Sequence, residues 1–112
     1  MYSNDIKQIE LQIDTAKELV KDCDALDRLY KNKDFVRLIE KKYFQDEPVR
    51  LTHLLSDPRF QTLEARTKLH EQMLGVSLLL DFLRNINRTG DELREKVAEF
   101  EQERELALQE QE

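Results

Sequence analysis

Apolar residues recur near the start of the chain with the alternating three-and-four spacing of a heptad repeat. They are Ile6, Ile9, Ile13, Ala16, Val20 and Cys23. This spacing forms one continuous apolar stripe on a helix, which is typical of helices that pack lengthwise against another helix. Because such a helix is marginal in water by itself, the stripe predicts a partner helix, in this chain or in a second copy.

A second heptad-like stripe lies in the latter half of the chain. After Leu63 it comprises Leu69, Met73, Val76, Leu80 and Leu83. It is widened by Leu74, Leu78, Leu79, Phe82 and Ile86. A helix this apolar on several sides is expected at the centre of a packed structure. We expect the two long helices to pair antiparallel, with residues 69–83 facing residues 6–23.

Short helices are predicted between the two long ones. The first long helix is expected to run from Ser3 or Asn4 to about Tyr30, followed by a turn with Asn32 as the next cap. A short aromatic-rich helix then covers about residues 34–44. A further helix, capped by Asp46 or Glu47 because proline is tolerated in a first turn, reaches about residue 55. Residues 46–48 are thus expected to interrupt the helical pattern, and a second break is expected at residues 56–58.

The two glycines stand within the last helical region and suggest special positions. Gly75 costs about 1 kcal/mol relative to alanine in mid-helix, so we expect a neighbouring helix to approach closely there. Thr89-Gly90-Asp91-Glu92 fits a capping box that would start a new helix, although an apolar stripe also continues across Gly90. The break is the favoured alternative. It divides the chain into a helical hairpin or bundle over residues 1–90 and a charged helix over residues 91–112, which would fray or become ordered on a partner.

The composition agrees with long amphipathic helices. Only 39% of the residues are hydrophobic and 38% are charged, and two glycines and two prolines are too few for the turns of a sheet protein of 112 residues. The predicted fold is therefore all-α: an antiparallel hairpin of long helices, or a small bundle, with coiled-coil-like seams and two short helices at one end.

The charge is unevenly distributed along the chain. Residues 91–112 contain nine acidic and three basic groups, which equals the net charge of −6 of the whole chain. An acidic end opposes contact with phosphate backbones, so nucleic acid is a disfavoured partner. No apolar run reaches the roughly 18 residues that span a bilayer, and no secretory signal is recognisable at the N-terminus. We therefore expect no membrane partner and a location in a reducing cytoplasm.

Residue types with catalytic potential do not form a recognised pattern. His53 and His70 lack the spacing of a helical metal pair, and neither has a glutamate three positions before it. We expect His53 to be partly buried beside Leu54 and His70 to be on the surface. Cys23 lies on the apolar stripe and is expected to pack as a small hydrophobe rather than act as a nucleophile. The sequence predicts a protein that is not an enzyme and needs no metal or cofactor.

One cluster of positive charge has two interpretations. Its members are Lys31, Lys33, Arg37, Lys41 and Lys42. The favoured interpretation is a solvated helix face with Asp34 and Glu40 interspersed. The alternative is a docking surface for an anion, with Tyr30 or Tyr43 stacking on a nucleotide. In an intermolecular version, residues 99–112 of one copy lie against the cluster of another.

Several short segments resemble a group of small helical proteins encoded by tailed bacteriophages, often near genes for virion components. They are Asn32-Lys33-Asp34-Phe35, Tyr43-Phe44, Glu47-Pro48-Val49-Arg50-Leu51, Leu54-Leu55-Ser56-Asp57-Pro58 and Phe82-Leu83-Arg84. The resemblance covers about residues 25–100 and contains no chemically diagnostic motif. It implies a phage origin, a location in the host cytoplasm or in the virion, and a role in particle assembly or in handling the host.

Two functional hypotheses follow. The first is a non-enzymatic helical protein that acts by self-assembly and protein–protein interaction, as a phage virion or morphogenesis component; its partner is a second copy, another protein, or both. The second is a phage inhibitor of host defence that binds a host protein or sequesters a nucleotide signal. A monomer at high concentration would contradict the first hypothesis. A lack of nucleotide binding would remove the nucleotide version of the second.

Overall fold

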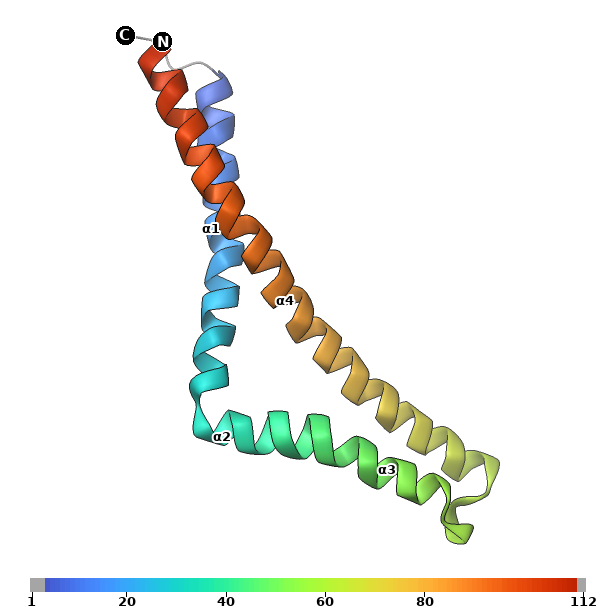
Figure 1. Cartoon of the computed structure of the whole chain (residues 1–112). Helices are drawn as coiled ribbons and strands as arrows, with labels where there is room; N and C mark the ends of the chain where they lie inside the picture. Colours follow the sequence, from blue (N-terminus) through green and yellow to red (C-terminus); the bar gives the residue numbers. More distant parts are fainter. Residues whose placement is uncertain (1–3, 111–112) are drawn as a thin grey trace. The chain divides into compact units, whose positions relative to one another are not determined.

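The computed structural model describes residues 4–110, and these residues form helices with no strand among them. This confirms the all-α fold. The elements in chain order are α1 (Asn4–Lys31), α2 (Lys33–Phe35), the π-helix η1 (Val36–Asp46), α3 (Glu47–Leu55), the 3-10 helix η2 (Pro58–Phe60) and α4 (Leu63–Glu110), as labelled in Figure 1. They divide into two compact units, residues 4–26 with 85–110 and residues 27–84.

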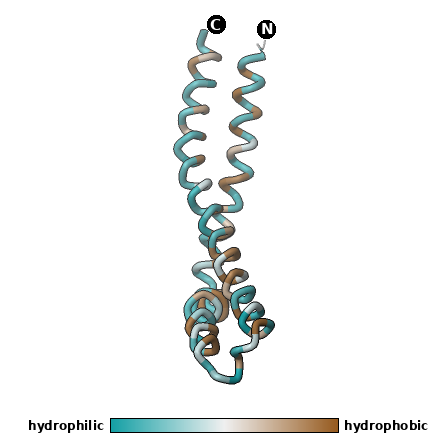
Figure 2. Tube along the Cα trace, turned by 90° about the vertical axis from the view of Figure 1, so that its right-hand side faces the viewer, coloured by the Kyte–Doolittle hydropathy of each residue, from teal (hydrophilic) through white to brown (hydrophobic). Residues whose placement is uncertain are grey.

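The first unit is an antiparallel pair of helices. The start of α1 and the end of α4 lie at the same end of this pair, and the two helices run side by side in both Figure 1 and Figure 2. Two ion pairs fix the register: Lys17 Nζ lies 3.1 Å from Glu101 Oε1, and Arg94 Nη2 lies 2.7 Å from Asp24 Oδ1. The expected antiparallel pairing of the long helices is thereby confirmed.

The apolar stripe of α1 forms the core of this unit. Ile6, Ile9, Ile13, Ala16 and Cys23 are buried, and Val20 is half-buried. The side of α4 that continues the three-and-four spacing past Gly90 carries the half-buried residues Leu93, Val97, Phe100 and Ala107. The partner of α1 in this unit is therefore this later part of α4, and the expectation that residues 69–83 would fill that role was wrong.

The helix break expected at Gly90 does not occur. Helix α4 continues through Gly90 to Glu110, and the glycine has no positive φ. The buried Gly90 lies against Cys23, and a Cβ placed on it would overlap the Cβ and Sγ of that cysteine. Close approach of two helices therefore explains this glycine. At Gly75 the nearest atom to such a Cβ is Tyr43 Oη at 3.8 Å, an ordinary contact, so the close approach expected there was wrong.

The second unit begins with the end of α1 and a sharp turn. Asn32 has extended backbone angles, and its side chain accepts hydrogen bonds from the N–H groups of Asp34 and Phe35 at 2.9 and 3.0 Å. This confirms Asn32 as a cap. From Lys33 the backbone remains helical as far as Leu55, because Asp46 and Glu47 both have right-handed helical angles. The predicted break before Pro48 was wrong, and the Asp46 side chain makes no capping bond.

The winding of this helix changes along its length. From Val36 to Asp46 it is a π-helix, and the Glu47 N–H donates to Lys42 O five residues back. Proline lacks an N–H and its ring crowds the carbonyl four residues earlier in an α-helix. Pro48 follows directly on the wider π turns, where i→i+5 bonding shifts the preceding carbonyls. We attribute the continuity of the helix across Pro48 to this change of winding.

The break at residues 56–58 is confirmed. Asp57 caps η2 by accepting a hydrogen bond from the Arg59 N–H at 2.9 Å. In α4, every seventh residue of the predicted stripe (Leu69, Val76 and Leu83) is buried, and Met73 and Leu80 are half-buried. The opposite side of α4 is not buried, since Leu74, Leu78 and Phe82 are 57–60% exposed. The expectation that this helix would be covered on several sides was therefore wrong.

Candidate functional site

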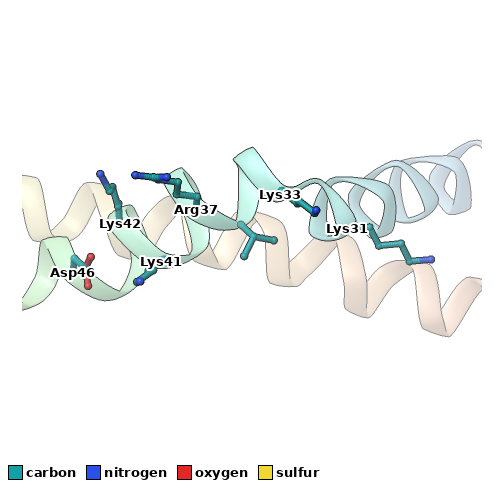
Figure 3. A pocket seen from close by; sticks show the side chains of 7 residues that line it. Lys31, Lys33, Arg37, Lys41, Lys42 and Asp46 are labelled. Atoms are coloured by element: carbon teal, nitrogen blue, oxygen red, sulfur yellow. The ribbon is translucent and has the colours of Figure 1, made fainter.

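The five cations of the sequence cluster line one open hollow in the second unit. Its walls are Lys31, Lys33, Val36, Arg37, Lys41, Lys42 and Asp46, and it encloses about 650 Å³ (Figure 3). Among the described residues, none of these five cations takes part in an ion pair, and all five are exposed. We call Lys31, Lys33, Arg37, Lys41 and Lys42 the basic face.

The π winding explains why the cations share one side. From Val36 onward the lining residues recur at intervals of about five: Val36 and Arg37, then Lys41 and Lys42, then Asp46. An α-helix repeats every 3.6 residues, whereas i→i+5 hydrogen bonds wind more residues into each turn and align positions four to five apart. If this segment were an α-helix, these positions would lie on different sides of it. The two acids expected to intersperse them, Asp34 and Glu40, do not line the hollow.

The aromatic residues of this region pack elsewhere. The rings of Tyr30 and Phe35 meet edge to face at 5.7 Å, and the rings of Tyr43 and Phe44 lie 5.7 Å apart. The Tyr43 hydroxyl is directed at Gly75 of α4. No aromatic residue is among those that line the hollow, so the geometry does not supply the stacking platform that the nucleotide hypothesis assigned to Tyr30 or Tyr43.

An apolar groove follows the flank of the helix pair in the first unit. Its lining comprises Leu11, Gln12, Thr15, Ala16, Leu19, Leu93, Lys96 and Phe100, around a volume of about 300 Å³. Leu11 is 66% exposed and Leu19 42% exposed, although both lie beside the buried stripe of α1. The heptad pattern missed this groove because the two leucines lie outside it. The signal that could have revealed it is the spacing of four between Leu11, Thr15 and Leu19, which places them on one helix face.

The free end of the same helix pair carries negative charge. A hollow of about 510 Å³ there is lined by Asp5, Gln8, Ile9, Gln12, Glu103, Leu106, Ala107 and Glu110. Three of these residues are acids and none is basic. Leu106 is 54% exposed in the middle of them. The sequence indicated the acidity of this segment but could not show that α1 adds Asp5 to it.

The residues considered for catalysis are separate from these surfaces. His70 is on the surface as expected, but His53 is exposed too, so its predicted burial was wrong. The helix turns Leu51, which is fully buried, inward in its place. The Cys23 thiol is 1% exposed, with Asn87 Oδ1 3.8 Å from its Sγ. Within residues 4–110 no three histidine, cysteine or acidic side chains are grouped as metal ligands, and no helix has the length and apolarity needed to cross a bilayer.

Comparisons with known proteins found no match: no protein-family model, no curated protein and no solved structure matches this sequence. The apolar groove and the basic face are therefore the features of the molecule from which a function can be inferred.

Proposed function

We propose that this chain is a non-enzymatic helical protein that acts by self-association, and that the apolar groove of the helix pair is its principal contact. The observation that carries the proposal is the exposure of Leu11 and Leu19 next to Phe100 along a continuous groove. Burying a leucine contributes about 1.5–3 kcal/mol relative to leaving it in water, so four leucines from two copies provide a substantial driving force.

A second copy is the occupant that best suits the groove. Thr15 lies midway between Leu11 and Leu19, so a twofold axis at Thr15 would place Leu11 of each copy opposite Leu19 of the other. A patch that matches itself in this way needs no other partner. Two helices bury only one seam between them, and packing a second pair on the flank produces a four-helix arrangement with a larger core.

The setting of this activity rests on the resemblance to phage proteins. If the chain is a virion or morphogenesis component, its gene should lie between genes for other particle proteins, and the protein should be present in purified particles. A position among small early genes would favour a host-directed role instead.

Light scattering coupled to size-exclusion chromatography tests self-association. At about 500 mM salt, where contacts between exposed charges are screened, we expect the wild type to form a defined oligomer at micromolar concentration and the double variant Leu11→Gln/Leu19→Gln to be monomeric. The matched control is Leu74→Gln/Leu78→Gln, which removes two leucines of similar exposure from the second unit. The control should keep the oligomer. A wild type that stays monomeric at high micromolar concentration, or equal behaviour of the two variants, would contradict the proposal.

A second candidate function is the sequestration of an anionic signal by an anti-defence protein. The five cations around one hollow favour it. Titration calorimetry with cyclic nucleotides tests it directly, with Lys41→Gln/Lys42→Gln as the variant that should lose the heat of binding. No heat with the wild-type protein would remove this candidate.

A further inference from the structure

We propose that the basic face binds the acidic side of the last turns of α4 in a second copy of the chain. This contact deepens the proposed self-association, because its partner is again this chain, but it uses surfaces different from the apolar groove. We call Glu92, Glu95, Glu99, Glu103 and Glu110, together with Leu106, the acidic face.

The acidic face is one continuous side of a helix. Its positions follow the three-and-four spacing that keeps residues on one side of an α-helix, and every one of them is exposed. With a rise of 1.5 Å per residue, the stretch from Glu99 to Glu110 is about 16 Å long. Among the described residues, none of its five glutamates is engaged in an ion pair, whereas the neighbouring Glu101 pairs with Lys17 of α1.

The shape of the basic face suits a long partner rather than a small molecule. Its cations follow one another along the π-helix and the preceding turn, and the hollow between them is open (Figure 3). A compact anion would contact only neighbouring members of this row. An acidic helix can contact the whole row at once, and pairs that are individually weak in water add up when they act together.

An apolar contact lies within each of the two charged faces. Val36 lines the hollow between the cations and is 36% exposed, and Leu106 is 54% exposed among the glutamates. A small apolar centre surrounded by complementary charge is the usual anatomy of a protein interface. The net charge of −6 disfavours the approach of a nucleic acid.

The two faces make the contact heterologous. The basic face comes from residues 31–42 and the acidic face from residues 92–110, so each copy has one of each and can bind one neighbour through each face. Such contacts continue into rings or chains, whereas a twofold contact through the groove ends at a dimer. The two contacts together provide what an assembly protein needs, a closed pair that can be linked further.

Complementary charge reversal tests the contact. The first variant is Lys41→Glu/Lys42→Glu and the second is Glu95→Lys/Glu99→Lys, both at exposed positions, and both are made in the Leu11→Gln/Leu19→Gln background so that the groove does not contribute. Sedimentation velocity at about 50 mM salt should show that the background chain without charge reversal associates. Each charge reversal alone should lower the affinity of this association at least tenfold. Mixing the two reversed chains should restore it. At about 500 mM salt all association should disappear, because exposed charges are then screened.

The matched control reverses two lysines elsewhere, Lys21→Glu/Lys68→Glu, which changes the net charge by the same amount and should leave association intact. If the mixed chains do not associate, or if the control weakens association as much as the reversal at residues 41 and 42, the proposed contact is overturned. Fluorescence anisotropy with a labelled single-stranded oligonucleotide is the other arm: binding to the basic face without restored association in the mixture would assign this face to nucleic acid instead. If the groove proposal fails, the result of the charge-reversal experiment is unaffected, because that experiment is made with Leu11 and Leu19 already replaced. The two proposals can therefore fail separately.

Discussion

Gly90 of α4 lies directly against the side chain of Cys23 of α1, so that no side chain larger than hydrogen fits between the two helices at this point. The contact lies near the end of the helix pair at which α1 reaches Leu26, close to the ion pair of Asp24 with Arg94. It explains a glycine that local patterns would assign to a helix end. It also makes the first unit sensitive to changes of one methyl group.

Substitution of the two glycines should have opposite effects. Gly90→Ala should lower the free energy of unfolding by about 1–3 kcal/mol, because the new methyl group overlaps Cys23 and forces the helices apart. Gly75→Ala is the matched control and should raise it by about 0.5–1 kcal/mol, since alanine favours the helix and meets only Tyr43 Oη at 3.8 Å. Urea unfolding followed by circular dichroism measures both. A Gly90→Ala protein as stable as wild type would contradict the close approach.

Neighbouring apolar residues of α1 should differ sharply in their importance for stability. Ile13 is 1% exposed, so Ile13→Ala should cost about 2–5 kcal/mol through lost burial and a residual cavity. Leu11 is 66% exposed, and Leu11→Ala should change the stability of the monomer by no more than about 0.5 kcal/mol. Unfolding is to be measured at a concentration below that of association. Equal costs for the two variants would mean that the register of the α1 stripe is different.

The thiol of Cys23 should report separation of α1 and α4. It is 1% exposed, so a thiol reagent should react with it roughly 100-fold or more slowly than with the unfolded chain, which corresponds to an opening free energy of about 2.7 kcal/mol or more. The control is Cys23→Ala/Leu11→Cys, which moves the thiol to an exposed position of the same helix. Below the concentration of association, that thiol should react at the rate of the unfolded chain. Fast reaction of Cys23 in the folded wild type would argue against its burial.

Asp57 should remain ionised to unusually low pH. Hydrogen bonds from the Arg59 side chain and then from its backbone N–H hold the Asp57 pKa at about 2, below the usual 3.8. Because the pKa is lowered in the folded state, this carboxylate contributes stability above pH 3.8 that is lost as the pH falls through about 2. Carboxyl NMR titration should show the low pKa, and Arg59→Gln should raise it.

A specific control for Asp57 lies in α3. The Glu47 pKa is lowered by a side-chain hydrogen bond from Arg50, so Arg50→Gln should raise the pKa of Glu47 and leave that of Asp57 unchanged. If Asp57 titrates in its ordinary range in the wild type, the pairing with Arg59 does not persist in solution.

The local features of the sequence predicted the local features of the fold. The heptad spacing of Ile6 to Cys23 located the long first helix and its buried side, since a helix repeats its side-chain directions at a fixed period. The side chain of Asn32 predicted the turn after that helix because a cap acts within three residues of itself. His53 was misplaced because Leu51 competes for the inward position on the same short helix and is buried there completely.

The candidate surfaces were less accessible to sequence reasoning. The cations were recognised as a cluster, but their alignment depends on i→i+5 hydrogen bonds over Val36 to Asp46, which side-chain periodicity calculated for an α-helix does not anticipate. The groove was missed because Leu11 and Leu19 form it only together with Phe100, which is distant in the sequence.

By itself, then, the sequence determined the all-helical class, the extent and buried side of α1, the cap at Asn32 and the break at residues 56–58, because each of these depends on interactions within a few residues. Only the tertiary structure decided that α4 passes unbroken through Gly90 and which part of it pairs with α1. A glycine is equally compatible with a helix end and with a close helix contact, and the side chain that distinguishes the two, Cys23, comes from another part of the chain.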